Sequence, residues 1–184
     1  MTNNNPTAFI MVGLPGSGKS TMVNRFVIGN PDTFVASLDN ILERFAKEEN
    51  ISYGESFKLH VKEASDELEK SISEAIASGL NIIFDQTNLT ELGRRRRIAQ
   101  LKNSDYNYRI IAQVITIEDS ILEQRLINRE KETGKHIPQD VIKNMKKSFV
   151  LPSTEEGFYY IDTYHFRQGF NNIQVGGPPN RTYS

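Results

Sequence analysis

The stretch Gly13-Leu-Pro-Gly-Ser-Gly-Lys-Ser20 constrains the fold of this chain more than any other segment. The apolar run Ala8-Phe-Ile-Met-Val12 precedes it, and a run compatible with a helix, Thr21 to Val27, follows it. A Gly-x-x-x-x-Gly-Lys-Ser turn between a strand and a helix is the phosphate-binding loop (P-loop) pattern, because its glycines let backbone N–H groups surround a phosphate. The stretch therefore predicts that the chain binds a nucleoside triphosphate.

The residues of this loop have separate expected roles. Lys19 is expected to reach the outer phosphates, and the Ser20 hydroxyl is expected to ligate Mg²⁺ beside them. The positive end of the helix that starts here adds to the attraction for a polyanion. The predicted cofactors are ATP and Mg²⁺. The residues predicted to contact the nucleotide are Gly13, Pro15, Gly16, Ser17, Gly18, Lys19, Ser20 and Thr21.

Strands and helices alternate along the rest of the sequence. Apolar runs bounded by turn residues predict further strands at 34–37, 81–84 and 108–116. Three- and four-residue apolar spacing and helix end signals predict helices at 40–47, 57–75, 91–101 and 119–129, with one more opened by Pro138. Gly79 ends the long helix, and 158–161 is either a last strand or an edge segment. The alternation predicts an α/β fold, a parallel sheet with helices on both faces.

The length and composition fit one domain. With 184 residues, of which 38% are hydrophobic, the chain can bury a sheet between helices, and no linker divides it. We expect a single domain over residues 1–166. Residues 167–184 are rich in Asn, Gly and Pro, and we expect a poorly ordered tail there.

Composition also excludes several classes of function. The 22 basic and 23 acidic residues nearly balance, so bulk charge gives no argument for a nucleic-acid partner. The chain has no cysteine, which excludes disulfides, thiolate metal sites and cysteine nucleophiles. The polar start, Met1 to Thr7, lacks the features of a secretory signal, and no apolar run is long enough to cross a membrane. We expect an intracellular, cytoplasmic protein without a membrane partner, in the host cytoplasm if it is phage-encoded.

Carboxylates follow two of the predicted strands, at the edge of a parallel sheet where ligands bind. Asp85 comes directly after Ile82-Ile-Phe84 and is predicted to hold Mg²⁺, directly or through water. The next residue is Gln86, where P-loop enzymes that hydrolyse ATP for mechanical work commonly have a glutamate. This difference favours a phosphotransferase over an ATPase, and the chain also lacks the Asn-Lys-x-Asp sequence that selects guanine.

Asp39 is the candidate for a base that accepts the proton of an attacking hydroxyl, because it lies at the end of the strand predicted at 34–37. The alternative is that Asp39 caps the helix that begins near Asn40. Its place in the same strand-end crevice as the phosphate-binding loop favours the catalytic role.

A basic segment in the second half of the chain predicts a lid. Arg125 and Arg129 lie four residues apart and share one face of a predicted helix. The segment continues through Lys131, Gly134 and Lys135. Arginine suits a lid over phosphates because its planar guanidinium binds two oxygens and keeps its charge when desolvated. The alternative is a solvated helix end, which the two glutamates in the segment support. Both arginines are candidate catalytic residues, and Arg129 is preferred.

Together these motifs resemble the phage-type polynucleotide 5′-hydroxyl kinases and their small relatives among the P-loop kinases, from Phe9 to Asp162. The matching segments are Gly13 to Ser20, Ser37-Leu-Asp39, Asp85-Gln-Thr-Asn-Leu89, His136-Ile-Pro138 with Val141, Ile142 and Met145, and Glu156-Gly-Phe158. The resemblance implies a three-layer α/β/α sandwich with a mostly parallel five-stranded sheet in the order 2-3-1-4-5 and a helical lid. It also implies that Asp39 is the general base, that Lys19 and Ser20 contact the triphosphate and Mg²⁺, and that a lid arginine stabilises the transition state.

The acceptor side departs from that family. Polynucleotide kinases typically read Arg-Asp-Asp-x-x-Arg, whereas this chain reads Leu38-Asp39-Asn40-Ile41-Leu42 and lacks the arginine that would help to hold the acceptor's phosphate. The basic run Arg94-Arg-Arg-Arg97 could contact a phosphate backbone, and the alternative is solubility with packing of the aliphatic stems. The residues predicted to contact the acceptor are Asp39, Thr87, Asn88, Arg94 and Arg95.

The sequence therefore favours an ATP-dependent kinase whose acceptor is a hydroxyl of a nucleic acid, either a 5′ end or a modified base. A kinase of a small metabolite or nucleotide sugar is the alternative toward which the missing arginine at Leu42 points. A non-catalytic nucleotide-binding module is a third alternative, which the combination of Asp39 with a lid disfavours. The sequence predicts no oligomeric state.

Overall fold

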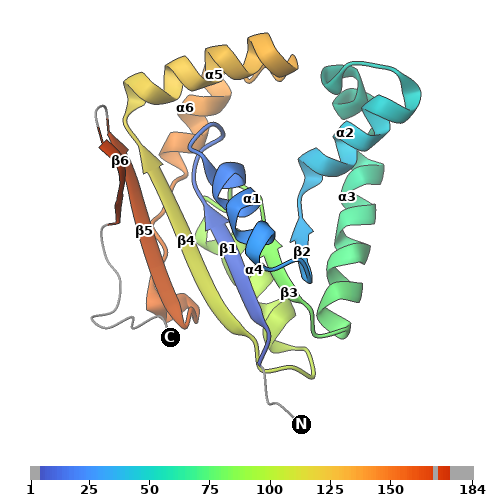
Figure 1. Cartoon of the computed structure of the whole chain (residues 1–184), viewed down its shortest axis with the longest axis vertical. Helices are drawn as coiled ribbons and strands as arrows, with labels where there is room; N and C mark the ends of the chain where they lie inside the picture. Colours follow the sequence, from blue (N-terminus) through green and yellow to red (C-terminus); the bar gives the residue numbers. More distant parts are fainter. Residues whose placement is uncertain (1–4, 168–169, 175–184) are drawn as a thin grey trace.

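The sheet has the strand order β2-β3-β1-β4-β5-β6 in the part of the chain that the structure describes, residues 5–167 and 170–174 (Figure 1). The structure is a computed structural model. The strands are β1 (Thr7–Val12), β2 (Thr33–Ala36), β3 (Asn81–Phe84), β4 (Arg109–Ile117), β5 (Tyr160–Arg167) and β6 (Phe170–Gln174). β1 to β5 are parallel, and β6 is antiparallel to β5. The predicted order 2-3-1-4-5 is confirmed, and β6 is an addition that the sequence did not predict.

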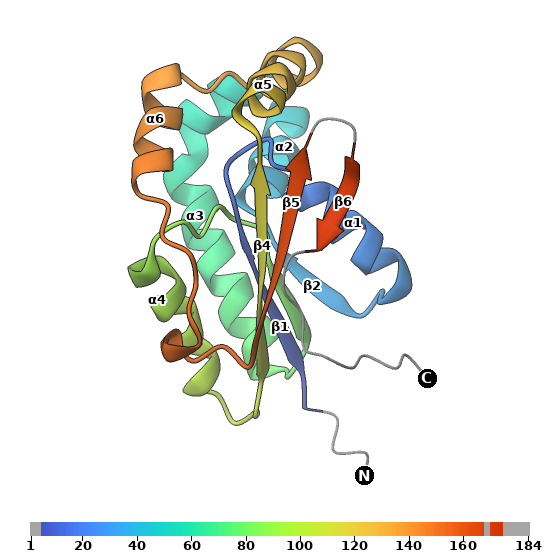
Figure 2. The same ribbon diagram turned by 90° about the vertical axis from the view of Figure 1, so that its left-hand side faces the viewer.

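Helices cover both faces of the sheet. They are α1 (Lys19–Gly29), α2 (Leu38–Glu49), α3 (Tyr53–Ala77), α4 (Glu91–Lys102), α5 (Asp119–Thr133) and α6 (Gln139–Lys147), with a 3₁₀ turn at Thr154–Glu156. In Figure 2, α1 lies on one side of the sheet, and α3, α4 and α6 lie on the other. The helix α5 lies above the carboxyl ends of the strands (Figure 1). The α/β class and the layered arrangement predicted from the sequence are confirmed.

Several element ends differ from the predictions by a few residues. The helix α2 begins at Leu38, with Ser37 as its N-cap residue, and Pro138 is the N-cap residue of α6 instead of its first helical residue. The strand β5 runs to Arg167, because it pairs with β4 up to Phe166, opposite Ile117, and Arg167 pairs with Phe170 of β6. At Gly79, φ is 65°, so the glycine ends the long helix α3 in the left-handed conformation as expected.

β1 fixes the centre of the fold because it is buried on both faces between β3 and β4. Ile10 packs in the core cluster that includes residues of α3 and α4, whereas the adjacent Met11 packs with Val23 of α1. Central parallel strands read as continuous apolar runs for this reason. The carboxyl end of β1, and the loop that follows it, therefore lies in the middle of the sheet edge.

Residues 167–184, where we expect a poorly ordered tail, include the end of β5 and the strand β6, which pairs with β5 between Tyr164 and Arg167. Residues 168–169 and 175–184 are also part of the expected tail, and they lie outside the described residues. Among the helices of the described ranges, none is both long enough and apolar enough to span a membrane.

Candidate active site

The loop between β1 and α1 has the backbone of a phosphate cradle. Gly16 and Gly18 have φ values of +80° and +109°, in the left-handed region that other residues avoid. A Cβ atom on Gly13 would lie 2.5 Å from the carbonyl oxygen of Ile115 and 2.8 Å from Oγ of Ser17. The glycines are thus required by backbone conformation and by close approach. Because α1 begins at Lys19, its free N–H groups face the same space.

Lys19 is held inside this cradle. Its residue is 7% exposed, and its Nζ donates a hydrogen bond of 2.9 Å to the carbonyl oxygen of Leu14. Burial lowers the pKa of Lys19 to about 8, although the charge of Asp85 partly opposes that shift. When neighbouring groups balance the charge of a buried lysine only partly, an added polyanion stabilises the charged form. The site is therefore electrostatically prepared for phosphate.

Ser20 and Asp85 meet where the sequence predicted a magnesium site. Oγ of Ser20 donates a hydrogen bond of 2.9 Å to Oδ2 of Asp85, which follows β3. Burial raises the pKa of Asp85, and the hydrogen bond from Ser20 and the charge of Lys19 oppose the increase. A hydroxyl and a carboxylate are the hard oxygen ligands that Mg²⁺ prefers alongside nucleotide phosphates. These two residues fit the ion that P-loop kinases use.

Asp39 does not cap a helix. It is the second residue of α2, one position beyond the first helical residue, and its carboxylate binds side chains instead of backbone N–H groups. Oδ1 accepts a hydrogen bond of 2.6 Å from the hydroxyl of Tyr53, and Oδ2 accepts one of 2.9 Å from Arg129 and one of 3.4 Å from Lys135. The capping alternative is therefore wrong, and the carboxylate faces the lid.

The surroundings of Asp39 keep it ionised. Burial by itself raises the pKa of Asp39, but the hydrogen bond from Tyr53 and the charges of Lys135 and Arg129 outweigh burial and lower the pKa below its ordinary value. Burial and the hydrogen bond to Asp39 raise the pKa of Tyr53, so its hydroxyl stays protonated as a donor. An ionised carboxylate with a free lone pair can accept a proton.

The two lid arginines have different partners. Arg129 of α5 reaches Asp39, whereas Arg125, one turn earlier, donates hydrogen bonds to the carbonyl oxygens of Gly16 at 3.4 Å and Ser17 at 3.1 Å. The guanidinium of Arg125 also lies 5.3 Å from the ring centroid of Phe166. Arg125 thus supports the phosphate-binding loop, and Arg129 faces the predicted base.

Lys135 closes the lid against the opposite side of the site. Its side chain is 9% exposed and forms ion pairs with Asp39 and Glu43 of α2. Its Nζ also lies 4.3 Å from the ring centroid of Tyr53. The turn that brings Lys135 into position follows Gly134, which ends α5 with a φ of 68°. These contacts therefore agree with the prediction of a lid and not with the alternative, a solvated helix end.

The segment after β3 supports the loop through its backbone. Nδ2 of Asn88 donates a hydrogen bond of 2.8 Å to the carbonyl oxygen of Met11, and the N–H of Gly13 donates one of 3.0 Å to the carbonyl oxygen of Thr87. Asn88 was predicted to contact the acceptor. Its side-chain N–H groups are instead committed to main-chain carbonyls, so the amide holds two loops together. Thr87 joins the phosphate-binding loop by its main chain.

The prediction that Arg94 contacts the acceptor is wrong. Arg94 is 0% exposed and binds Glu156 through two hydrogen bonds of 2.8 Å and 2.7 Å. Its Nη1 also donates to the carbonyl oxygens of Asn88, Leu89 and Val150. The residue needs a buried carboxylate because an unpaired charge in the interior is costly. Arg94 joins α4, the loop before it and the 3₁₀ turn.

The other arginines of this run also have intramolecular partners. Arg97 is 7% exposed and binds Glu69 of α3 through hydrogen bonds of 2.8 Å and 2.7 Å. Arg95 is exposed and pairs with Glu91 one turn earlier on α4. The run therefore mainly joins α4 to its surroundings through ion pairs, whereas the alternative interpretation was solubility with packing of the aliphatic stems. Arg95 stays a predicted acceptor contact.

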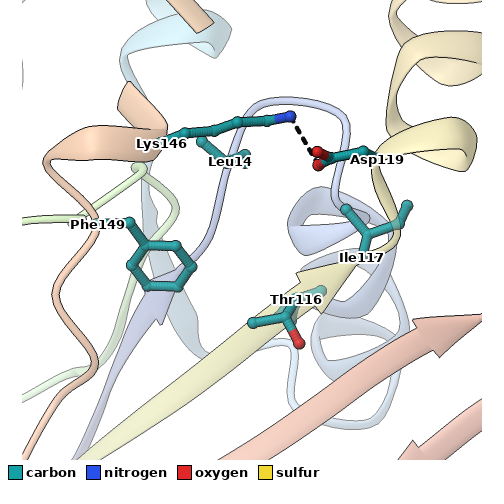
Figure 3. A pocket seen from close by; sticks show the side chains of 7 residues that line it. Leu14, Thr116, Ile117, Asp119, Lys146 and Phe149 are labelled. Carbon is teal, nitrogen blue, oxygen red and sulfur yellow. Dashed lines mark hydrogen bonds and ion pairs between the residues drawn. The ribbon is translucent and has the colours of Figure 1, made fainter. Parts of the chain in front are cut away.

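A small cavity lies beside the phosphate-binding loop, on the β4 side of β1 (Figure 3). It has a volume of about 200 Å³, and an ion pair of 2.6 Å between Lys146 and Asp119 lies at its rim. Leu14, Ile117 and Phe149 contribute apolar side chains to its wall. Asp39 follows β2, on the other side of β1, so this cavity is separate from the predicted base.

The family of the chain follows from comparison with known proteins. The model of a family described as an AAA domain, AAA_33, matches residues 9–152. The chain belongs to this AAA domain family. The matched residues, 9–152, hold Lys19, Asp39, Asp85 and both lid arginines.

Two curated relatives of this AAA domain are similar in sequence. Heterogeneous nuclear ribonucleoprotein U-like protein 2 of Mus musculus is 31% identical over 148 residues, which are 78% of this chain and 19% of that protein. L-seryl-tRNA(Sec) kinase of Methanococcus maripaludis is 31% identical over 150 residues, which are 79% of this chain and 53% of that protein. The chain thus spans at most about half the length of these relatives.

Two solved structures share the fold of this AAA domain. A fungal RNA kinase matches with a TM-score of 0.56 and 13% identity, over 90% of this chain and 77% of that one. A gluconokinase from Sinorhizobium meliloti 1021 matches with a TM-score of 0.51 and 14% identity, over 89% of this chain and 84% of that one. The fold is therefore that of P-loop kinases.

Tyr53 is the site residue that the sequence analysis missed. It is the first residue of α3, and a capping box between Ser52 and Glu55 fixes the start of that helix. The Ser-x-x-Glu pattern at 52–55 is visible in the sequence and places Tyr53 at a helix start. That this helix start faces Asp39 depends on how α2 and α3 pack, which no local pattern encodes.

Proposed function

We propose that this protein is an ATP-dependent phosphotransferase that moves the γ-phosphate of ATP to a hydroxyl group. The observation that carries the proposal is the contact between the carboxylate of Asp39, which is kept ionised, and the lid residue Arg129. The charges of both residues also act on the pKa of Lys19 in the phosphate-binding loop. A base, a mobile cation and a phosphate site in one crevice are the parts that phosphoryl transfer needs.

The residues of the chain divide the reaction between them. The loop N–H groups and Lys19 bind and orient the outer phosphates. Mg²⁺ held by Ser20 and Asp85 would neutralise phosphate charge. Asp39 takes the proton from the acceptor hydroxyl while the oxygen of that hydroxyl forms a bond to the γ-phosphorus. The bond from that phosphorus to the β,γ-bridging oxygen breaks, and ADP leaves with the electron pair. Arg129 leaves Asp39 and binds the phosphoryl group, where negative charge develops.

We propose a nucleic acid as the acceptor. The similarity to an L-seryl-tRNA(Sec) kinase, 31% identical over 150 residues, supports an acceptor hydroxyl carried by RNA. The exposed Arg95 on α4 supports a contact with a phosphate backbone, since its partner Glu91 is itself half-exposed and can be displaced.

A small-molecule acceptor is the second candidate, and a specific feature favours it. Leu42 is 0% exposed and supplies no cation beside Asp39. The nearest further charge on α2 is the carboxylate of Glu43, which is paired with Lys135. Arg94 is also buried and cannot reach a backbone phosphate. A small polyol would need no phosphate contact on this side of the site.

Transfer of radiolabelled γ-phosphate tests both proposals. The acceptors to compare are 5′-hydroxyl DNA and RNA oligonucleotides, aminoacylated and free tRNA, and a panel of nucleosides and sugars. Labelling that requires a polymer supports the nucleic-acid acceptor, and labelling of a free nucleoside or sugar at a comparable rate supports the second candidate. No labelling of any acceptor by wild-type protein that binds ATP would overturn the phosphotransferase proposal. Lys19→Met is the control for label from a contaminating kinase.

A further inference from the structure

We propose that Tyr53 is a positioning residue that holds the carboxylate of Asp39 in the orientation needed to accept the acceptor's proton. This inference rests on the phosphotransferase function proposed above. Tyr53 lies 14 residues from Asp39 in the sequence, and its hydroxyl donates a hydrogen bond of 2.6 Å to Oδ1.

The two oxygens of Asp39 have different kinds of partner. Arg129 and Lys135, both cations of the lid, bind Oδ2, whereas the uncharged hydroxyl of Tyr53 binds Oδ1. A carboxylate oxygen has two lone pairs, so Oδ1 can receive a proton on one while Tyr53 occupies the other. The positive charges beside Oδ2 oppose its protonation, and Lys135 continues to do so when Arg129 moves to the phosphoryl group. The contacts therefore direct the incoming proton to Oδ1.

Tyr53 is itself held in place. The side chain of Ser52 accepts a hydrogen bond from the N–H of Glu55, and the Glu55 carboxylate accepts one from the N–H of Ser52. Ser56, one turn into α3, is 0% exposed and donates a hydrogen bond of 2.8 Å to the carbonyl oxygen of Leu42 in α2. These contacts join the start of α3 to α2, so the distance from the Tyr53 hydroxyl to Asp39 is set by packed backbone.

Arg129 and Lys135 cannot hold the carboxylate of Asp39 in this orientation throughout the reaction. Arg129 is needed at the transferring phosphoryl group, and Lys135 is shared with Glu43. When a nucleotide attracts Arg129, Asp39 loses one of the groups that orient it. The hydroxyl of Tyr53 has no attraction to phosphate that compares with that of a cation, so it remains on Oδ1. It is therefore the contact that lasts through the transfer.

Charged groups face Asp39 from several elements, and the effect of Tyr53 adds to theirs. They are Glu43 of α2, Lys19 of α1, Arg129 of α5, Lys135 after α5 and Asp85 after β3. The hydrogen bond from Tyr53 lowers the pKa of Asp39. Its removal leaves all of those charges in place and raises the pKa of Asp39.

Tyr53→Phe tests the inference, because the phenyl ring keeps the face on which Lys135 lies and only the hydroxyl is lost. We expect single-turnover transfer at saturating ATP to fall about ten- to a hundred-fold, as a misplaced base would cause, with ATP affinity unchanged. The acid limb of the pH profile for transfer should move to higher pH. Tyr108→Phe is the matched control, since it removes a tyrosine hydroxyl that donates to the carbonyl oxygen of Leu80.

The outcomes separate this inference from the function on which it rests. If Asp39→Asn loses transfer while Tyr53→Phe transfers as wild type with an unmoved pH profile, only the role of Tyr53 is overturned. Equal losses in Tyr53→Phe and Tyr108→Phe, with lower thermal stability in both, would also overturn it, because the effect is then structural. If the wild-type protein transfers phosphate to no acceptor, the proposed function and the role of Tyr53 are both overturned.

Discussion

Nη2 of Arg129 donates a hydrogen bond of 2.9 Å to Oδ2 of Asp39, although 90 residues separate the two in the sequence. Before substrates bind, the lid cation and the predicted base neutralise each other. On the proposed function, we expect a γ-phosphate to compete with Asp39 for the guanidinium, which would couple nucleotide binding to release of the predicted base. The lid would then keep Asp39 from acting until a nucleotide is present.

Changing each lid arginine to alanine should impair a different step, either phosphate transfer or ATP binding. Arg129→Ala should reduce single-turnover transfer by about a hundred- to a thousand-fold with little change in ATP affinity, because its charge is needed where negative charge develops. Arg125→Ala should mainly weaken ATP binding, since Arg125 holds the carbonyl groups of Gly16 and Ser17. Nucleotide titration and rapid-quench transfer on both variants measure the difference. The reverse pattern would contradict the assignment of Arg129.

Asp39→Asn should abolish most of the transfer while leaving the fold intact. An amide cannot accept the proton, and a positioned base is worth about a hundred- to ten-thousand-fold in rate. Because Asp39 caps no helix and its ion pairs with Arg129 and Lys135 are partly exposed, thermal unfolding should change little, and ATP affinity should not fall. Calorimetry, nucleotide titration and single-turnover transfer on this variant provide the three readouts. Near-normal transfer would remove Asp39 from the mechanism.

ATP affinity should decrease as pH rises above about 8, the value to which burial lowers the pKa of Lys19. Below that pH the lysine is already charged in the free protein. Above it, ATP binds a neutral lysine, and binding must take up a proton, because adjacent phosphates raise the pKa of Lys19 in the complex. Isothermal titration at several pH values, in buffers of different ionisation enthalpy, measures the uptake. Lys19→Met should bind ATP weakly and without this slope.

The buried ion pair of Arg94 should matter for stability and not directly for chemistry. Arg94→Met leaves Glu156, whose side chain is 2% exposed, without its partner, and should cost about 3–5 kcal/mol of unfolding free energy. Arg95→Met is the control from the same run and should cost less than about 0.5 kcal/mol. Urea denaturation measures both. Equal losses would mean that burial does not distinguish the two arginines.

The sequence predicted those features that are local patterns. The phosphate-binding loop needs particular residues at fixed spacing, and a strand buried on both faces, such as β1, needs an uninterrupted apolar run. Their combination with alternating helices and with the family resemblance led to the strand order, which is confirmed. The pairing of Arg129 with Asp39 also agrees with a lid over the site, and the catalytic roles of both stay predictions.

The features that could not be predicted depend on tertiary packing. Arg94 and Arg95 are adjacent and chemically identical, yet one is buried against Glu156, 62 residues away, and the other is exposed. The helix α4 alone does not say which of its faces meets the 3₁₀ turn. Tyr53 is likewise an ordinary helix-start residue until α2 and α3 bring it to Asp39.

The strand β6 has a consequence for how copies of the chain can associate. Its five residues pair with β5, which has eight, and the opposite edge of the sheet is the four-residue strand β2. Edge strands expose unpaired backbone N–H and C=O groups that can recruit strands of other chains. Without β6, the longer β5 would form that edge and offer a template for intermolecular pairing. With β6 in place, that edge of the described sheet is a five-residue strand instead of an eight-residue one, and a shorter edge strand is a poorer template for such pairing.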